Sequence, residues 1–186
     1  SNTFGFWSIC SDMAWWLDVW VRRFYKRVER MHVIHEATAT EVDEDKFYKY
    51  RASGGTNCSS AFKFIAKQFE NRYPPDSWNV YVFYFTDGDN WREDNEVFIE
   101  TIKRDFPGNK VNFIGITQVL SHSYDGSLKH LVDVSLADGT LDKKYIKTAS
   151  VGPTLVGGTL GEDERNEQIM KAIRHLLGAG KVKDDN

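Results

Sequence analysis

The decisive stretch of this chain is Phe83-Tyr84-Phe85-Thr86-Asp87-Gly88-Asp89-Asn90-Trp91, a hydrophobic run that ends abruptly in two carboxylates and an amide. Parallel strands buried on both faces are continuous apolar runs, and ligands bind where such strands deliver their carboxyl ends to the surface. Asp87 is therefore the residue at which we expect chemistry or a bound cation.

Strand-like and helix-like segments alternate on both sides of this run. The predicted strands are 30–37, 38–42, 79–85, 111–119 and 145–151, with 3–9 as a candidate further strand. Apolar residues at helical spacing predict helices over 13–24, 58–69, 97–106, 127–132 and 163–177. The alternation predicts an α/β fold with a mostly parallel central sheet and helices on both faces. Residues 38–42 are expected to be antiparallel at one edge, and 79–85 away from the edges.

Length and charge limit the possible partners. The chain has 186 residues, 41% hydrophobic and 27% charged, which describes a single domain over 1–186. A net charge of -3 gives no electrostatic reason to expect nucleic acid or an anionic membrane as partner. A local basic cluster is interpreted as the solvated face of a helix, and it comprises Arg22, Arg23, Lys26, Arg27 and Arg30.

Cysteine usage and hydropathy favour a cytoplasmic protein. The sequence has two cysteines, Cys10 and Cys58, and its amino end does not resemble a secretory signal. It also has no apolar run of the roughly 20 residues that a membrane helix needs. Cys58 lies on the apolar stripe of its predicted helix, which indicates a small buried residue and not a nucleophile.

Four ordered motifs resemble one family. They are His35-Glu36-Ala37-Thr38-Ala39-Thr40-Glu41-Val42, then Ser53-Gly54-Gly55-Thr56 with Cys58-Ser59-Ser60-Ala61, then Arg72-Tyr73-Pro74-Pro75 with Trp78-Asn79-Val80-Tyr81, and finally Asp87-Gly88-Asp89-Asn90-Trp91. In order and spacing they resemble the YeaH/YhbH family of bacterial and archaeal proteins, which looks like a branch of the von Willebrand factor A (VWA) fold.

This resemblance implies a Rossmann-like VWA domain with a metal-ion-dependent adhesion site. In that site three loops at one sheet edge hold Mg²⁺, which prefers oxygen ligands and retains water molecules that a partner carboxylate can displace. The second loop contributes a threonine, matched by Thr56, and the third an aspartate, matched by Asp87.

The first loop departs from the Asp-x-Ser-x-Ser signature of the fold. In one register Ser8, Cys10 and Asp12 occupy its three ligand positions, so that Ser8 and Asp12 are the available oxygen ligands. In another register Asp12-Met13-Ala14 belongs farther along the first helix, and residues of the loop are missing from the chain as given. Both registers stay open, and under either one the site can be degenerate or empty.

The neighbouring polar residues are interpreted as structural. Many family members have two adjacent histidines where this chain has His35-Glu36, and we interpret this pair as polar residues at a strand end instead of extra ligands. Asp89 and Asn90 are expected to fix their loop, because short side chains of this kind bond to nearby backbone in tight turns.

The sequence thus predicts a non-catalytic protein-binding module. By family resemblance its partners include a PrkA-type serine kinase or a SpoVR-like protein, in a stress- or sporulation-linked complex. One alternative is a magnesium-dependent hydrolase or phosphotransferase that uses Asp87 and Asp89, although the sequence lacks a phosphate-cradling glycine motif. A second alternative is a metal-free structural relative.

Overall fold

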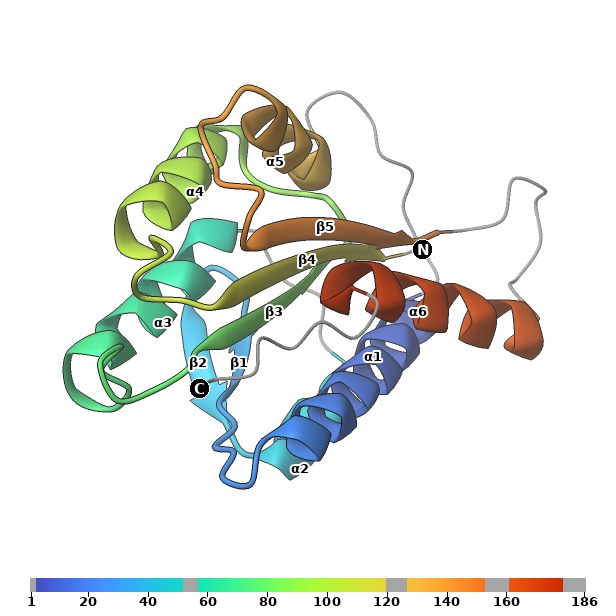
Figure 1. Cartoon of the computed structure of the whole chain (residues 1–186). Helices are drawn as coiled ribbons and strands as arrows, with labels where there is room; N and C mark the ends of the chain where they lie inside the picture. The colour runs from blue at the N-terminus through green and yellow to red at the C-terminus, as the bar shows by residue number, and fades with distance from the viewer. Residues whose placement is uncertain (1–2, 52–56, 120–126, 153–160, 179–186) are drawn as a thin grey trace.

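Three parallel strands form the centre of the fold. They are β3 (Tyr81–Thr86), β4 (Phe113–Val119) and β5 (Ile146–Val151), hydrogen-bonded in the order β3-β4-β5. The computed structural model describes residues 3–51, 57–119, 127–152 and 161–178. Helices cover both faces of the parallel sheet (Figure 1), which confirms the predicted α/β fold class.

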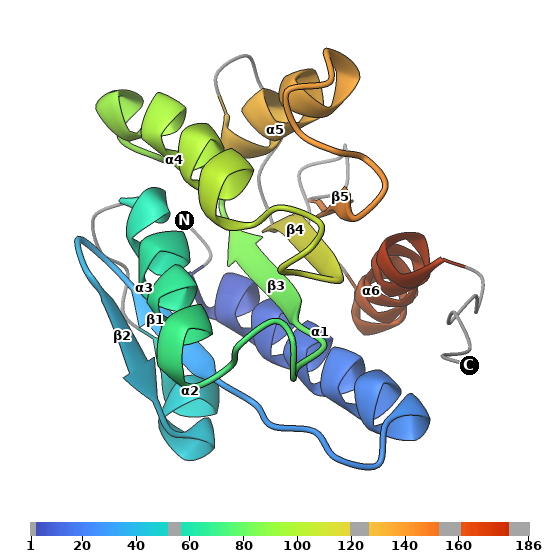
Figure 2. The same cartoon turned by 60° about the vertical axis from the view of Figure 1, so that its left-hand side comes forward.

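The two faces of the sheet belong to two hydrophobic clusters. Helices α3 (Cys58–Asn71), α4 (Arg92–Asp105) and α5 (Leu128–Ala137) cover one face, while α1 (Thr3–Phe24) and α6 (Glu162–Leu177) cover the other (Figure 2). Successive strand residues point to opposite faces. Accordingly Val82 and Tyr84 pack in the first cluster, whereas Phe83 and Phe85 pack in the second.

The central strand is β4, and the expectation that 79–85 lies away from the edges is wrong. β3 pairs with β4 alone among the described strands, so it forms an edge of this sheet. The central position suits β4, because Ile114 and Ile116 are fully buried on it. Gly115 is also close-packed, since a Cβ there would come within 3.0 Å of the Phe113 ring and 3.3 Å of the Phe83 ring.

Residues 32–42 form a separate hairpin instead of an edge of the central sheet. β1 (His32–His35) and β2 (Ala39–Val42) pair antiparallel, with His32 opposite Val42, in a two-stranded sheet of their own. The antiparallel pairing was predicted, but the edge position was wrong. The hairpin reaches β3 through side chains, because the Tyr84 hydroxyl lies 3.0 Å from Nε2 of His35.

The first helix begins earlier than the sequence predicts. Residues 3–9 are the first turns of α1 and not a strand. The reason is that Ile9, Met13 and Leu17 recur every four residues, and their exposures of 1%, 0% and 2% show one continuous buried stripe. Trp16 is also at helical spacing in the sequence, three residues after Met13, but its side chain is 42% exposed.

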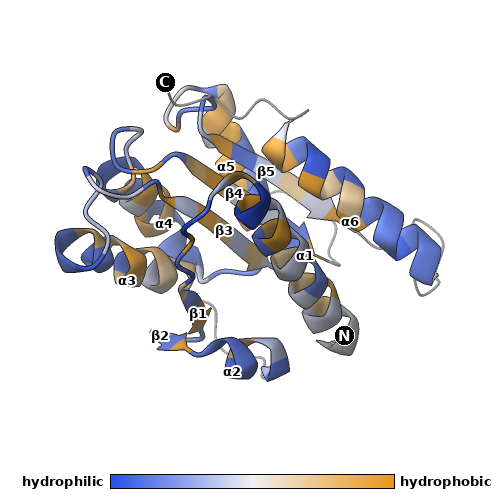
Figure 3. Ribbon diagram, turned by 60° about the horizontal axis from the view of Figure 1, so that its bottom comes forward, coloured by the Kyte–Doolittle hydropathy of each residue, from blue (hydrophilic) through white to orange (hydrophobic). Residues whose placement is uncertain are grey.

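The acidic turn after β2 starts a short helix, α2 (Glu44–Lys49). Asp43 is its N-cap, and Oδ1 of Asp43 accepts a hydrogen bond from the backbone N–H of Lys46 at 2.7 Å. β3 is coloured mainly hydrophobic in Figure 3, whereas α2 and the first turns of α6 are mainly hydrophilic. Within the described ranges, no helix has the length and apolar character needed to cross a membrane.

Candidate functional site

Asp87 directly follows β3, at the carboxyl end of the parallel sheet, and its side chain is exposed. Its Oδ1 accepts a hydrogen bond from the backbone N–H of Asp89 at 3.1 Å. Between them Gly88 has a φ of 97°, a conformation that favours glycine. The backbone N–H of Gly88 donates to Oγ1 of Thr86 at 3.0 Å, and its carbonyl accepts from the backbone N–H of Leu128 at 2.9 Å. The Asp87 carboxylate is therefore presented by a fixed turn.

The surroundings of Asp87 favour its protonated form. Desolvation raises the pKa of the Asp87 carboxyl above its ordinary value, and repulsion from Asp89 adds to the increase. The hydrogen bond from the Asp89 backbone opposes this change. A cation or a basic partner group close to this carboxyl would favour its charged form and oppose the increase in pKa.

Asn90 and Asp94 hold the start of α3 against the Asp87 loop. Oδ1 of Asn90 accepts from the backbone N–H of Cys58 at 3.0 Å, and Nδ2 of Asn90 donates to Oδ1 of Asn95 at 3.0 Å. The buried Asp94 accepts from the backbone N–H of Ser59 at 2.8 Å and from the Ser59 hydroxyl. These two side chains replace a local N-cap, since Asn57 makes no side-chain capping bond. Asn90 therefore has a structural role, but its side chain bonds to α3 and α4 and not, as predicted, to nearby backbone of its own turn.

Both cysteines are buried next to this loop. The thiol of Cys58 lies 3.5 Å from the Asp89 carbonyl oxygen, and burial raises the pKa of Cys58 to about 12. Burial also raises the pKa of Cys10, with a further increase from the charge of Asp87. Because a thiolate is the reactive form, neither residue is an activated nucleophile.

His35 and Glu36 are both engaged by tyrosines. The His35 ring stacks on Tyr84 with 5.4 Å between ring centroids, and desolvation lowers the pKa of His35. Glu36 accepts a hydrogen bond from the Tyr50 hydroxyl at 2.5 Å. These contacts place the pair at the end of β1, where they join the hairpin to its neighbours.

Ser8 and Asp12 lie one turn apart on α1, and both contact the same arginine. The Arg165 guanidinium of α6 donates to the Ser8 hydroxyl at 2.6 Å and to a carboxylate oxygen of Asp12 at 2.7 Å. A cationic group thus already occupies the oxygens that one register offers to a metal. Thr56 lies outside the described residues. In the part of the chain that the structure describes, no three His, Cys, Asp or Glu side chains are grouped to hold a metal ion.

The roles of Asp94 and Arg165 were missed at the sequence level. Asp94 stands in the first turn of α4, where an acidic residue is ordinarily explained by the helix dipole. Arg165 stands in a charged stretch of α6 that resembles any solvated helix face. Their partners lie 35 and 153 residues away, so no local pattern indicates either contact.

Comparison with protein families gives one match that spans most of the chain. Residues 9–155 match the family described as "Protein of unknown function (DUF444)". This match is consistent with the YeaH/YhbH resemblance of the four motifs. No solved structure matches the chain significantly.

The curated relatives carry the name UPF0229 protein. A relative from Psychromonas ingrahamii is 36% identical over 138 residues, which is 71% of this chain and 32% of the relative. One from Pseudomonas putida is 40% identical over 81 residues, or 44% of this chain and 19% of the relative. One from Bacillus thuringiensis is 30% identical over 130 residues, or 69% of this chain and 33% of the relative. The chain therefore spans about a third or less of the length of these relatives.

Proposed function

The chain belongs to the DUF444 family, and on this basis we propose that it is a non-catalytic VWA-like module that binds protein partners at its Asp87 edge. The Asp87 edge is the turn Asp87-Gly88-Asp89 at the carboxyl end of β3. The observation that carries the proposal is an exposed carboxylate with a raised pKa, held by a rigid turn at the sheet edge where ligands of α/β folds bind.

The side chains around Asp87 support binding in preference to catalysis. Asn90 and Asp94 are used to hold α3, and the two thiols are buried in their protonated form. His35, with a lowered pKa, bonds to the Tyr84 hydroxyl. Among the described residues the Asp87 edge therefore offers no nucleophile paired with a base of the kind that covalent acyl-transfer sites use.

Mg²⁺ is proposed to complete this site. Asp87 fits a hard cation, because its exposed side chain presents carboxylate oxygens at the carboxyl end of β3. Thr56 is proposed as a second ligand of the cation, because it matches the threonine of the second loop in the family motif. Ser8 and Asp12 do not fit, since Arg165 holds both of them. A bound cation would supply an open coordination position for a carboxylate of the partner.

The proposed partners follow the family resemblance. They are a PrkA-type serine kinase or a SpoVR-like protein in a cytoplasmic, stress- or sporulation-linked complex. The competing proposal, a magnesium-dependent hydrolase or phosphotransferase, is favoured by one observation. Asp89 lies next to Asp87, and its charge contributes to the raised pKa of Asp87.

The test compares two charge-matched variants in the full-length protein. Asp87→Asn removes the carboxylate at the carboxyl end of β3, and Asp76→Asn removes an exposed one from the turn that precedes β3. We expect calorimetric titration with MgCl₂ to show binding to wild type and to Asp76→Asn, and none to Asp87→Asn. Thr56→Ala should weaken the same binding.

Capture of the purified kinase and SpoVR-like protein, in magnesium or in chelator, then tests the function. Capture that depends on both magnesium and Asp87 supports the proposal. Metal-insensitive capture would support the structural relative instead. Turnover of a phosphoester or nucleotide that Asp87→Asn abolishes would establish the enzyme and overturn the binding module.

A further inference from the structure

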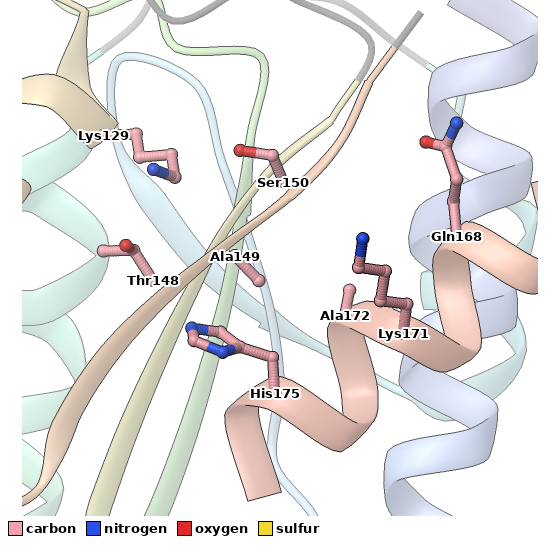
Figure 4. Close-up of a pocket in the computed structure, with 8 residues that line it drawn as sticks. All are labelled: Lys129, Thr148, Ala149, Ser150, Gln168, Lys171, Ala172 and His175. Carbon is pink, nitrogen blue, oxygen red and sulfur yellow. The ribbon is translucent and has the colours of Figure 1, made fainter. Parts of the chain in front are cut away.

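A groove runs along the outer edge of β5, on the far side of the sheet from β3. Its volume is about 470 Å³, and its lining residues are Lys129, Thr148, Ala149, Ser150, Gln168, Lys171, Ala172 and His175. Lys129 comes from α5, and Gln168, Lys171, Ala172 and His175 come from α6 (Figure 4). The helices on the two faces of the sheet thus form the walls, and the edge of β5 forms the floor.

The backbone of Thr148 and Ser150 is directed into this groove. In a parallel pair, alternate residues of a strand bond to a given neighbour. The backbone N–H of Ile114 donates to the Tyr145 carbonyl at 2.8 Å, with Ile114 opposite Ile146, so Lys147 and Ala149 are the β5 residues that face β4. Thr148 and Ser150, which alternate with them, direct their N–H and C=O groups outward.

Gln168 shows that the outer edge accepts a hydrogen-bond partner. The backbone N–H of Gly152 continues the outward series and donates to Oε1 of Gln168 at 3.1 Å. This carbonyl oxygen occupies the place that a carbonyl of an added strand would take. The next outward N–H groups along the edge are those of Ser150 and Thr148, beside the open part of the groove.

The walls of the groove carry positive charge. Lys129 and Lys171 line it from opposite sides, and none of the described lining residues is acidic. Asp133 partly offsets Lys129, because its carboxylate pairs with Lys129 at 2.6 Å and accepts from the Thr148 hydroxyl. Lys171 has no ion-pair partner among the residues that the structure describes, so its charge is uncompensated there. An exposed strand edge is a template for pairing, and side chains of opposite charge on the incoming strand add specificity.

We propose that the β5 groove binds an extended acidic peptide segment of a partner protein, which adds a fourth strand to the sheet at Thr148–Ser150. The backbone of the segment pairs with the outward groups of β5, and its acidic side chains meet Lys171. This surface is separate from the Asp87 edge and does not depend on a bound metal.

The experiment measures fluorescence anisotropy of a labelled peptide with alternating Glu and Val, in chelator, so that the Asp87 edge does not contribute. A Lys/Val peptide and a Glu/Val peptide with N-methylated backbone serve as probes of charge and of backbone pairing. We expect binding of the Glu/Val peptide, at least tenfold weaker binding of the other two, and weakening by salt.

Two pairs of variants locate the site. Ser150→Pro removes an outward N–H without touching the β4–β5 ladder, whereas Ser150→Ala keeps it; proline is tolerated at such edge positions. Lys171→Glu reverses a charge in the groove, and Lys67→Glu reverses an exposed charge on α3. Circular dichroism checks that each variant is folded.

We expect Ser150→Pro and Lys171→Glu to lose at least tenfold in affinity, and the two matched controls to stay within twofold. Equal binding by Ser150→Pro and Ser150→Ala would overturn the added strand. Equal binding of the N-methylated and unmodified Glu/Val peptides would also overturn the added strand, because binding would then depend on charge and not on backbone hydrogen bonds. Analytical ultracentrifugation tests whether the chain self-associates. Self-association that Ser150→Pro abolishes would show that a second copy of the chain pairs with this edge, and it would overturn the peptide proposal.

Discussion

Asp94 of α4 accepts a hydrogen bond of 2.8 Å from the backbone N–H of Ser59, the second residue of α3, although the two residues are 35 positions apart. The same carboxylate also accepts the Ser59 hydroxyl, and both residues are buried. The N-cap side chain of Asn57 bonds to the Ser59 hydroxyl and not to a backbone N–H, so this helix is capped by a neighbouring helix. This contact fixes the position of α3 next to the Asp87 turn.

Replacing Asp94 should destabilise the fold. In Asp94→Ala the buried Ser59 N–H loses its acceptor, while the Ser59 hydroxyl keeps Oδ1 of Asn57, so the change should cost about 1–3 kcal/mol of unfolding free energy. Denaturation with urea measures the loss, and Asp76→Ala in an exposed turn is the control, with a change within about 0.5 kcal/mol. An unchanged midpoint for Asp94→Ala would show that water replaces the carboxylate and that the capping bond contributes nothing.

Asp87 should reduce stability at neutral pH in the absence of metal. Its folded-state pKa lies above the ordinary value of 3.8, because desolvation disfavours the carboxylate. Between the ordinary and the raised pKa the folded state binds more protons than the unfolded state, so stability falls as pH rises through that interval. Asp87→Asn should therefore have a higher melting temperature than wild type at neutral pH.

The Asp87→Asn difference should shrink as pH falls below 3.8, where Asp87 is protonated in both states. Solvent screens the exposed carboxylate, so the effect is small. Melting curves in chelator across pH 3 to 7 measure it. A difference that is constant across this range would assign the effect to something other than the titration of Asp87.

The two cysteines should resist modification in the native protein. Burial raises the pKa of Cys58 to about 12 and that of Cys10 further still, so very little thiolate forms at neutral or mildly alkaline pH. Ellman's reagent should react with both thiols at once in denaturant and slowly, through unfolding, in its absence. Rapid native reaction of one thiol would contradict its burial and reopen a nucleophilic role.

Arg165 should connect α6 to α1 energetically. Its guanidinium contacts Ser8 and Asp12, and the Arg165 and Asp12 side chains are 25% and 41% exposed. For a partly exposed pair, Arg165→Ala should cost about 0.5–1 kcal/mol. The control is Arg174→Ala at an exposed position of the same helix.

A double-mutant cycle of Arg165→Ala with Asp12→Ala measures the coupling between the two side chains, which should account for most of this loss. The Arg165→Ala variant also tests Ser8 and Asp12 as metal ligands. A magnesium-dependent rise in melting temperature that is larger in this variant than in wild type would show that these oxygens bind the cation once the guanidinium is removed.

Local patterns in the sequence determined the elements of this protein and the place of Asp87. Apolar residues repeat at helical spacing in α3, α4 and α6, and a continuous apolar run forms β3, because each pattern reflects which side of an element is buried. The change from apolar to acidic residues at Thr86-Asp87 also marked the strand end correctly. The sequence erred at 3–9, where a short apolar segment fits a strand and a helix equally well.

Only the tertiary structure decided how these elements meet. In it β4 and not β3 is the central strand, and the β1–β2 hairpin is separate from the parallel sheet. The side chains of Ser8 and Asp12 both bond to Arg165. The tertiary structure also made Asp94 the cap of α3. The physical reason is that hydrogen bonds and ion pairs between residues 35 to 157 positions apart leave no periodic trace in the chain. Packing of the two hydrophobic clusters brings these distant polar groups together, and the buried pair Ser59 and Asp94 must then be satisfied.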